Sequence, residues 1–434
     1  MGLFNWLRRL LGFENPENQP QIGSDSASST ASAFAPSGDV ARRQAKHRRV
    51  KLVSLRYRSS AQVGGQTSSV GRRAYRFARP SMRGGWLDLT LDQDAGRLER
   101  FSLPNISIPE ELAKWLEIPL GQLAWLVHRF EPEQCPLDDR AAHYCYRWIK
   151  KQTGGRRLIE APKPKLKHVQ WRILDGILGR VPAHSAAHGF IAGRSICTNA
   201  QPHIGQRVIL KLDLENFYPS VSLNRVVAIF RSLGYCREAA IWLGRLTTTS
   251  LPAVMQGQGR ANADFKPYLG RRLPQGAPTS PALANLSAFS LDVRLAGLAR
   301  SFGANFTRYA DDLTFSGDEQ FLRSLAVFIP LVDQIVRSER FSLNKKKRKV
   351  IRNNQRQTVT GVVVNSHLNV ARPDYEILKA ILTNCVRRGP STQNHDRHES
   401  FSAHLQGRIA HVGQLNPARG ERLRRLFEQI DWNK

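Results

Sequence analysis

The sequence predicts an α+β protein preceded by a basic, partly disordered N-terminal extension. From Leu137 onward, short apolar runs typical of strands alternate with helical patterns. Residues 306–316 hold two apolar strand patterns around a polar tip, which indicates a hairpin and therefore antiparallel pairing. Residues 1–136 instead contain a low-complexity stretch and a run of positive charge. A chain of 434 residues suffices for two to four domains of about 100–200 residues each.

The charge balance points to a polyanionic partner. The chain carries 65 Lys and Arg against 35 Asp and Glu, a formal net charge of +30. RNA or DNA is favoured over a membrane, because no run of about 18 apolar residues could cross a bilayer. The five cysteines form no C-x-x-C pair, which disfavours a disulfide scaffold or a zinc knuckle. Sparse cysteines and the lack of a signal-peptide pattern predict a cytoplasmic protein.

The N-terminal extension divides into two predicted parts. Residues 1–39 contain an amphipathic helical pattern, Met1–Phe13, followed by a linker rich in Ser, Ala, Pro and Asn. This helix either docks on a partner or membrane surface or caps the protein's own core. Residues 40–136 begin with a basic arm, residues 40–87, which has thirteen Lys and Arg, no acid and interspersed aromatic residues. Nucleic-acid contact by phosphate neutralisation and base stacking is favoured over a nonspecific solubilising tail.

The rest of the chain shows alternating strand and helix patterns. Ile108–Arg129 holds two short helical patterns, for which a packed helical pair is favoured over a helix-turn-helix motif. The C-terminal stretch Leu405–Ile430 is basic and helical. Between these segments we expect strands at Arg157–Pro162 and Val208–Leu214, helices at Leu223–Leu233 and Leu283–Ser301, and a hairpin at Phe306–Ser316 that turns at Ala310-Asp311-Asp312. Thr358–Asn365 is a further β-rich run.

Acidic residues are scarce, yet two clusters stand at predicted strand ends. Asp213 follows the apolar strand Val208–Leu212, and Asp311 and Asp312 occupy the hairpin tip after Tyr309. Adjacent carboxylates repel each other, so their clustering indicates that they bind a cation. The alternative is that Tyr309–Asp312 is a plain polar turn. Oxygen ligands without His or Cys suit Mg²⁺ rather than Zn²⁺. Two such ions about 3.5–4 Å apart would serve phosphoryl transfer.

Further sequence blocks accompany these acids in a distinctive order. They are Arg157-Leu-Ile-Glu-Ala-Pro162, His188-Gly-Phe-Ile-Ala-Gly-Arg-Ser195, Asn199-Ala-Gln-Pro-His203, Leu273-Pro-Gln-Gly-Ala-Pro-Thr-Ser-Pro281, Tyr309-Ala-Asp-Asp312, Asn344-Lys-Lys-Lys347 and Val359-Thr-Gly361. In this order and spacing the chain resembles a bacterial retron reverse transcriptase, of the subset with a longer N-terminal extension. The resemblance covers roughly residues 137–431. The blocks at Asn199–His203 and Val359–Gly361 resemble retron-specific marks.

The resemblance implies an RNA-directed DNA polymerase with a right-hand fold and a small antiparallel palm sheet. Residues 137–365 would form fingers and palm, and residues 366–434 a helical thumb. The enzyme would use dNTPs to copy a cognate structured RNA into a branched RNA–DNA product. Such systems serve in defence against phage, which makes an effector protein a further expected partner. The cofactors would be two Mg²⁺ ions, for which Mn²⁺ can substitute.

The resemblance also assigns roles to individual residues. Asp213, Asp311 and Asp312 would be the catalytic residues and metal ligands, with the Leu214 carbonyl as a further ligand. Nucleotide-binding residues would be Tyr218 as a steric gate against the 2′-hydroxyl, Gln275, Gly276, Arg157, Lys163 and Lys165. Primer, template or RNA contacts would be Tyr309, Lys347, Asn199, His203, Val359, Thr360 and Gly361.

Simpler interpretations of these residues stay open. Tyr218 could be a core tyrosine, Gln275-Gly276 a helix entry, and the lysines solvated surface groups. His188 and His203 are expected to be structural histidines or RNA contacts rather than metal ligands. For the whole chain, the alternatives are an RNA-binding scaffold or antitoxin-like component, or a reverse transcriptase of another bacterial branch. No RNase H, endonuclease, protease or maturase pattern follows the expected thumb, so RNA trimming would need a host enzyme.

Overall fold

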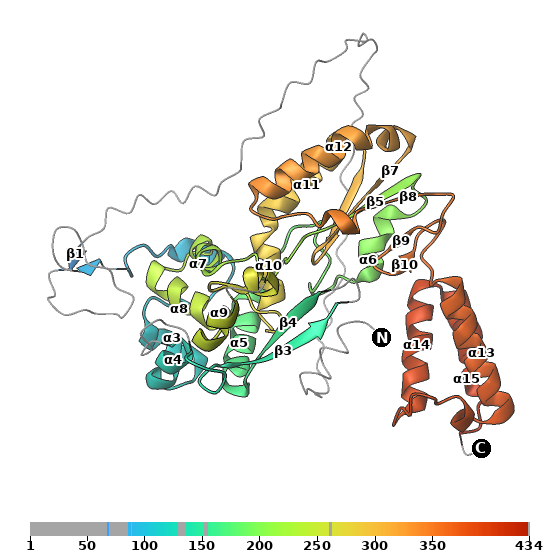
Figure 1. Ribbon diagram of the computed structural model, residues 1–434, viewed down its shortest axis with the longest axis horizontal. Coiled ribbons are helices and arrows are strands. Elements are labelled where there is room, and N and C mark those ends of the chain that lie inside the picture. The colour runs from blue at the N-terminus through green and yellow to red at the C-terminus, as the bar shows by residue number, and fades with distance from the viewer. Residues whose placement is uncertain are drawn as a thin grey trace, which may run out of the picture. The chain divides into compact units, whose positions relative to one another are not determined.

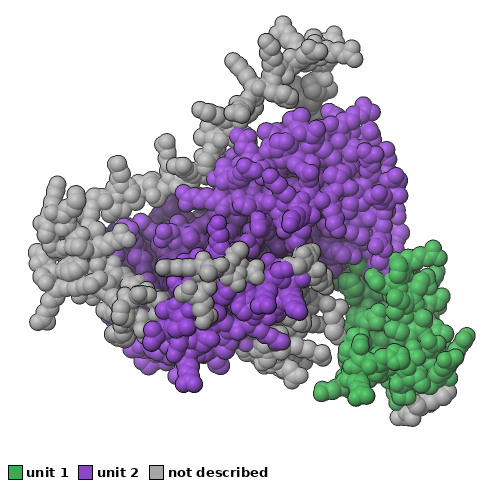
Figure 2. Space-filling model, viewed as in Figure 1, with its two compact units in different colours: residues 1–53, 372–434 green, residues 54–371 purple. Residues whose placement is uncertain are grey.

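The computed structural model describes residues 67–68, 86–87, 89–128, 136–151, 155–259 and 263–432 (Figure 1). The expected helix Met1–Phe13, the linker and nearly all of the basic arm lie outside the described residues. Within the arm, β1 (Thr67–Ser68) pairs with β2 (Trp86–Leu87), a short ladder that the sequence pattern does not predict. The chain divides into two compact units, residues 54–371 and residues 1–53 with 372–434 (Figure 2).

A four-stranded antiparallel sheet with the order β6-β7-β5-β8 lies in the larger unit. β6 (Asn305–Tyr309) and β7 (Asp312–Gly317) form the predicted hairpin. β5 (Val208–Asp213) pairs with β7 along its whole length, and β8 (Lys349–Arg352) pairs with the other edge of β5. The predicted α+β class with a small antiparallel sheet is therefore confirmed.

Aromatic packing covers one face of this sheet. Phe306 and Phe315 are cross-strand neighbours whose rings stack with centroids 4.7 Å apart. Phe315 also meets Phe328 of α12 (Glu319–Ser338) edge to face. α11 (Phe289–Ser301) contacts both β6 and α12, and the two helices lie together beside the sheet in Figure 1. Burial of these rings explains why the hairpin holds one register, since a one-residue slip would expose them.

A second, two-stranded hairpin consists of β3 (Tyr144–Lys150) and β4 (Arg156–Pro162). Leu158 of β4 forms a buried apolar cluster with Leu251 and Tyr268. α5 (Pro164–Gly176) follows at once, with Pro164 in its first turn, where the missing amide costs no hydrogen bond.

The N-terminal helices pack on this unit as the predicted helical pair. α3 (Pro109–Leu116) and α4 (Leu120–Leu126) are separated at Glu117, which has a left-handed φ of 58°, and at Pro119. α3 contacts α8, and the Asp92 carboxylate accepts a 2.8 Å hydrogen bond from the Arg237 amide at the start of α8. Nearby lie α2 (Ala95–Arg100), α7 (Leu223–Ser232) and α8 (Arg237–Thr247).

The prediction of one helix over Leu283–Ser301 is wrong, because two helices cover this stretch. α10 (Ser280–Ser287) ends at Ala288, and α11 begins at Phe289. Neither Gly nor Pro marks the break in the sequence. The Ser287 carbonyl accepts a 2.8 Å hydrogen bond from the Arg225 guanidinium at the end of α10.

The C-terminal unit is helical, and the single pattern expected over residues 405–430 is also two helices. Asn416 caps the second helix by accepting a hydrogen bond from the Arg419 amide, and Pro417 occupies its first turn. A Cβ on Gly420 would lie 2.3 Å from the Gly413 Cα, so the two helices cross in close contact. The helices of this unit are α13 (Arg372–Arg388), α14 (Phe401–Leu415) and α15 (Pro417–Glu428).

Shorter elements connect these parts. They are α6 (Ile196–Ala200), α9 (Ala253–Gly259), β9 (Thr358–Val359), β10 (Val362–Val363) and the 3-10 turns η1 (Leu178–Arg180), η2 (Gln201–His203), η3 (Ala263–Tyr268), η4 (Lys345–Lys347) and η5 (Pro390–Thr392).

Candidate active site

Three carboxylates meet where the central strands end. Asp213 is the last residue of β5, and Asp312, the first of β7, lies directly opposite it in the antiparallel register. Opposed residues project from the same face of a sheet, so these side chains are neighbours. Asp311 occupies the turn before β7, and its carbonyl accepts a 2.9 Å hydrogen bond from the Leu214 amide. The fold therefore brings the two predicted acidic clusters together.

The three carboxylates create excess negative charge. Burial, together with the carboxylates of Asp312 and Asp213, raises the pKa of Asp311 to about 6. Burial also raises the pKa of Asp312. Within the described part of the chain, no group of three or more His, Cys, Asp or Glu side chains is already arranged to hold a metal ion. The chemistry of the carboxylates nevertheless fits a hard divalent cation, whose charge would favour their ionised forms.

Lys347 contributes a positive charge at this site. It ends η4, which is joined to β5 by a 2.8 Å hydrogen bond from the Asn344 amide to the Asp213 carbonyl. The Lys347 Nζ donates to Asp213 Oδ1 over 2.7 Å. Partial burial disfavours the charged amine, but the bond to Asp213 and the charges of the nearby carboxylates raise the pKa of Lys347 overall. This contact is not predicted by the sequence, and a role of Lys347 near pyrophosphate stays a prediction.

The turn that carries Asp311 has an unusual backbone. Ala310 has a left-handed φ of 56°, a conformation that costs a residue with a Cβ about 1 kcal/mol or more. Gly189 lies against this turn, and a Cβ built there would be 2.7 Å from the Ala310 nitrogen. Sequence reasoning treats Gly189 only as part of a block, whereas the structure shows why this position requires glycine.

We expect Gly189→Ala to lower the rate of DNA synthesis on the order of 10- to 100-fold, because the new methyl group must displace the turn that carries Asp311. Single-turnover incorporation of one dNTP measures this effect. Gly297→Ala on α11 is the matched control, since its Cβ would meet no atom within 4 Å. Equal rates for the two variants would show that the Gly189 contact is not needed for catalysis.

Tyr218 follows β5 and lies close to the carboxylates. Its side chain is half-buried, and its ring is tilted against that of Phe217 with centroids 5.6 Å apart. Burial, followed by the negative charge of Asp311, raises the pKa of the Tyr218 phenol, so the side chain is neutral at physiological pH. The position of this neutral aromatic ring near Asp311 is compatible with the predicted role as a sugar gate, which stays a prediction.

The loop that contains Gln275 and Gly276 packs against β4. The Gln275 carbonyl accepts a 2.7 Å hydrogen bond from the Glu160 amide. Gly276 has a φ of 130°, and a Cβ there would lie 3.0 Å from the Glu160 carbonyl oxygen. Glu160 itself forms a fully buried ion pair with Arg272, whose Nη2 lies 2.8 Å from Glu160 Oε1. Sequence reasoning does not predict this pair, which joins β4 to the loop before Gln275.

The three predicted basic nucleotide ligands differ in their contacts. Arg157 is exposed on β4. Lys163 donates from Nζ to the carbonyls of Asp139 and Arg140 over 3.3 and 3.1 Å. Lys165 lies over the Trp125 ring, with Nζ 5.7 Å from its centroid. Both lysines are therefore engaged with the protein itself, and nucleotide binding by all three residues stays a prediction.

The blocks predicted to contact RNA are partly buried together. The Asn199 amide nitrogen approaches the Thr360 hydroxyl at 3.4 Å, so the two retron-like marks meet in the fold. His203 is fully buried, and its ring nitrogens pair with the hydroxyls of Ser316 and Thr307 at 2.6 and 2.8 Å. Burial lowers the pKa of His203 to about 3, so the ring is neutral.

Their burial gives several of these residues an internal role. His203 and Val359 are both fully buried, which agrees with the structural alternative expected for His203, and RNA contact at these two positions stays a prediction. Thr360 and Gly361 have left-handed φ values of 47° and 85°, as a two-residue hairpin turn between β9 and β10 requires. Tyr309 is half-buried next to Phe190, with ring centroids 6.1 Å apart, and its primer contact stays a prediction.

Similarity to known proteins shows to which class of enzyme this chain belongs. The family of reverse transcriptases, RNA-dependent DNA polymerases, matches residues 149–364, which include all three carboxylates. This chain is thus an RNA-directed DNA polymerase, a nucleotidyltransferase with the right-hand polymerase fold that the resemblance implied. Among the described residues, no helix combines the length and the apolar character needed to cross a membrane.

Comparison with individual proteins then defines the family. The Retron Mx65 reverse transcriptase of Myxococcus xanthus is 41% identical over 76% of this chain and 74% of its own length. The Retron Mx162 reverse transcriptase of the same organism is 36% identical over 73% and 66%. The Retron Ec86 reverse transcriptase of Escherichia coli is 32% identical over 65% and 80%. The chain belongs to the retron reverse transcriptases.

Proposed function

We propose that this enzyme copies part of a cognate structured RNA into a branched RNA–DNA molecule, and that it serves with an effector protein in defence against phage in the cytoplasm. Membership of the retron family supports the choice of template and product. The observation that carries the chemical part is the register that places Asp213 opposite Asp312, with Asp311 in the adjoining turn. A scaffold protein would not need three carboxylates whose charges repel each other.

The carboxylates of Asp213, Asp311 and Asp312, with the Leu214 carbonyl, would hold two divalent cations. Mg²⁺ is the expected ion, Mn²⁺ can substitute, and the pair would activate the attacking hydroxyl and stabilise the leaving oxygen of the dNTP. Lys347 donates a hydrogen bond to Asp213, and its positive charge would neutralise part of the negative charge of the carboxylates until the ions bind. Gln275 and Gly276 would receive the nucleotide, because glycine allows its close approach to the backbone. Exposed Arg157 on β4 would bind the triphosphate.

We expect Tyr218→Ala to raise the use of ribonucleotides relative to dNTPs by about 10- to 100-fold, because removal of the ring removes the clash with the 2′-hydroxyl. Single-nucleotide extension with matched ribonucleotide and deoxyribonucleotide measures the ratio of kcat/KM values. Phe217→Leu is the control for altered packing of the neighbouring ring. An unchanged ratio in Tyr218→Ala would place the gate at another residue.

The test of the proposed product uses the purified full chain and RNA transcribed from the DNA beside its gene. With labelled dNTPs, we expect DNA that remains covalently joined to the RNA and that shortens when ribonuclease removes the RNA. Unlinked DNA, made with equal efficiency on any primed RNA, would contradict the proposal and indicate another reverse transcriptase branch. Phage challenge of cells that carry the intact locus or Asp311→Asn tests the defence role.

A further inference from the structure

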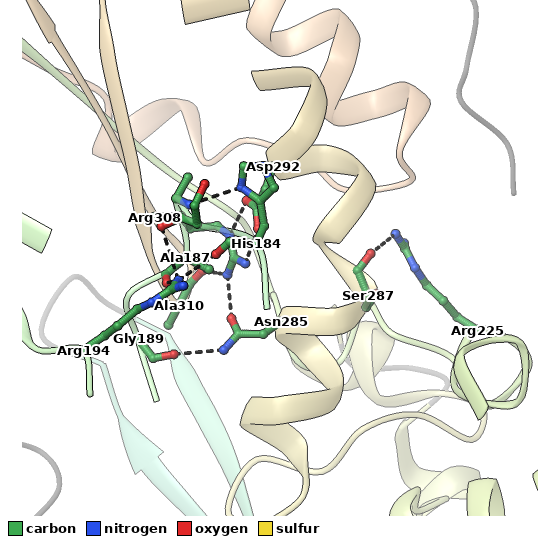
Figure 3. Close-up of polar contacts among 12 residues, drawn as sticks. His184, Ala187, Gly189, Arg194, Arg225, Asn285, Ser287, Asp292, Arg308 and Ala310 are labelled. Carbon is green, nitrogen blue, oxygen red and sulfur yellow. Dashed lines mark hydrogen bonds and ion pairs between the residues drawn. The ribbon is translucent and has the colours of Figure 1, made fainter. Parts of the chain in front are cut away.

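A buried guanidinium lies directly behind the turn that carries Asp311. Arg308 stands on β6 three residues before Asp311, and its side chain is fully buried. Its Nε and Nη2 donate to the two carboxylate oxygens of Asp292 over 2.7 and 2.6 Å. Its Nη1 donates to Asn285 Oδ1 and to the Ala310 carbonyl, both over 2.9 Å (Figure 3).

The bond to Ala310 constrains the peptide that leads into Asp311. The Ala310 carbonyl belongs to the same peptide plane as the Asp311 amide, so its orientation helps set where the Asp311 side chain points. Ala310 holds a left-handed φ of 56°, which is disfavoured unless its surroundings impose it. The bond from Arg308 is a charge-assisted hydrogen bond and therefore one of the stronger constraints available.

Asn285 extends the same network to the other side of the turn. Its Oδ1 accepts from Arg308, and its Nδ2 donates to the Gly189 carbonyl over 2.9 Å. Gly189 in turn is the residue that packs against the Ala310 nitrogen. The backbone of Arg308 also pairs with this loop, since the His188 amide donates to the Arg308 carbonyl over 2.7 Å. One side chain thus connects two sequence blocks that meet at the turn.

We propose that Arg308 is a positioning residue for DNA synthesis. Paired with Asp292, its guanidinium fixes the Ala310–Asp311 peptide and so keeps the Asp311 carboxylate aligned with Asp213 and Asp312. The inference rests on the proposed role of Asp311 as a metal ligand. Stability alone does not account for the arrangement, because a buried ion pair often contributes no more than apolar residues of similar volume. Besides its bonds to Asp292, the guanidinium donates from Nη1 to the Ala310 carbonyl in the turn itself.

The test compares two arginines that each donate to a backbone carbonyl, the fully buried Arg308 and the half-buried Arg225. Arg308→Lys keeps the charge but loses the planar arrangement that reaches Asp292, Asn285 and Ala310 together. Arg225→Lys is the matched control, since Arg225 donates to the carbonyls of Ser287 and Glu339, away from the turn (Figure 3). For each purified full-length variant we would measure thermal unfolding, Mn²⁺ binding by electron paramagnetic resonance, and kcat against Mg²⁺ concentration.

We expect Arg308→Lys to weaken Mn²⁺ binding and lower kcat by about 10- to 100-fold, the usual range for residues that orient metal ligands. Arg225→Lys should lower the unfolding midpoint but leave Mn²⁺ binding and the Mg²⁺ dependence unchanged. If Arg308→Lys loses only thermal stability, as Arg225→Lys does, the residue is merely structural and the proposal is wrong.

Asn285→Ala keeps the proposal testable if Arg308→Lys does not fold. This variant leaves the Arg308–Asp292 ion pair in place and removes the connection from the guanidinium to the Gly189 carbonyl. Asn285 Oδ1 accepts from Nη1, the same nitrogen of Arg308 that donates to the Ala310 carbonyl, so its removal should let this nitrogen move away from the turn. We therefore expect a loss of Mn²⁺ affinity in the same direction, and wild-type affinity would contradict the proposal. Asp311→Asn, measured alongside, distinguishes a failure of the proposed role of Asp311 from a failure of the inference on Arg308. Normal synthesis by that variant would overturn the role of Asp311, whereas its inactivity together with wild-type Mn²⁺ binding and kcat in Arg308→Lys would overturn only the inference on Arg308.

Discussion

Asp311→Asn should abolish DNA synthesis on a primed RNA template while leaving the fold and RNA binding intact. We expect a loss of at least about 10³-fold in kcat, because the amide cannot supply the negative charge that a divalent cation requires in this position. The asparagine is nearly isosteric, so the turn between β6 and β7 should keep its backbone. Single-turnover incorporation of one labelled dNTP at saturating Mg²⁺ measures the effect.

The same substitution should not destabilise the metal-free protein. Burial and the neighbouring carboxylates raise the pKa of Asp311 to about 6, so the native state favours the protonated form. For an acid whose pKa is raised by folding, the associated stability is present at low pH and is lost as pH rises through about 6. Asparagine avoids that loss, and without divalent cations at pH 7 its unfolding midpoint should equal or exceed that of the wild type.

Asp318→Asn provides the matched control for Asp311→Asn. Asp318 caps α12 by accepting a 2.9 Å hydrogen bond from the Phe321 amide, a role that asparagine fills equally well. The control should therefore retain activity and stability. Normal extension by Asp311→Asn would remove this residue from the catalytic site, and a large drop in its unfolding midpoint would show that the carboxylate stabilises the fold instead.

Much of the active site could be predicted because its signals are local. Asp213 ends an apolar strand and Asp311 lies at a hairpin tip. Both features can be predicted from the pattern of neighbouring residues. The register between β5 and β7 is not readable in this way, and the family resemblance implies only that Asp213, Asp311 and Asp312 act together as metal ligands. The helical pair α3 and α4 was predicted for the same local reason, since Pro119 follows the break.

The parts that could not be predicted depend on contacts between distant residues. Nothing in the sequence distinguishes Arg308 from the many other basic residues. Only the structure shows that it forms a buried ion pair with Asp292. Asn199 and Thr360 lie in separate sequence blocks 161 residues apart, and the sequence gives no sign that their side chains approach each other. The sequence leaves His203 open as a structural histidine or an RNA contact, and it gives no sign of the two hydroxyl groups that His203 binds more than 100 residues away. The break between α10 and α11 carries no Gly or Pro and coincides with a hydrogen bond from Arg225.

Deletion of Met1–Leu87 should weaken binding of the cognate RNA and flatten its salt dependence. The basic arm, residues 40–87, carries thirteen positive charges and no acid. Each phosphate that it neutralises contributes about 0.7–0.9 to the slope of log affinity against log salt. If about four of these charges pair with phosphates, the slope should fall by about three, and affinity at low salt by about two orders of magnitude. Filter binding from 50 to 200 mM salt measures both quantities.

Two comparisons separate an RNA-binding arm from other roles of the extension. Deletion of Met1–Gly38 removes the apolar pattern and the linker but keeps all thirteen charges, so its salt slope should match that of the full chain. Extension of a preannealed primer–template at saturating concentration should survive both deletions, because Asp213, Asp311 and Asp312 remain. The anchor at Leu89, whose carbonyl accepts from the Glu238 amide, also remains in both deletion variants. An unchanged slope and affinity after deletion of Met1–Leu87 would mean that the arm serves a protein partner instead of RNA.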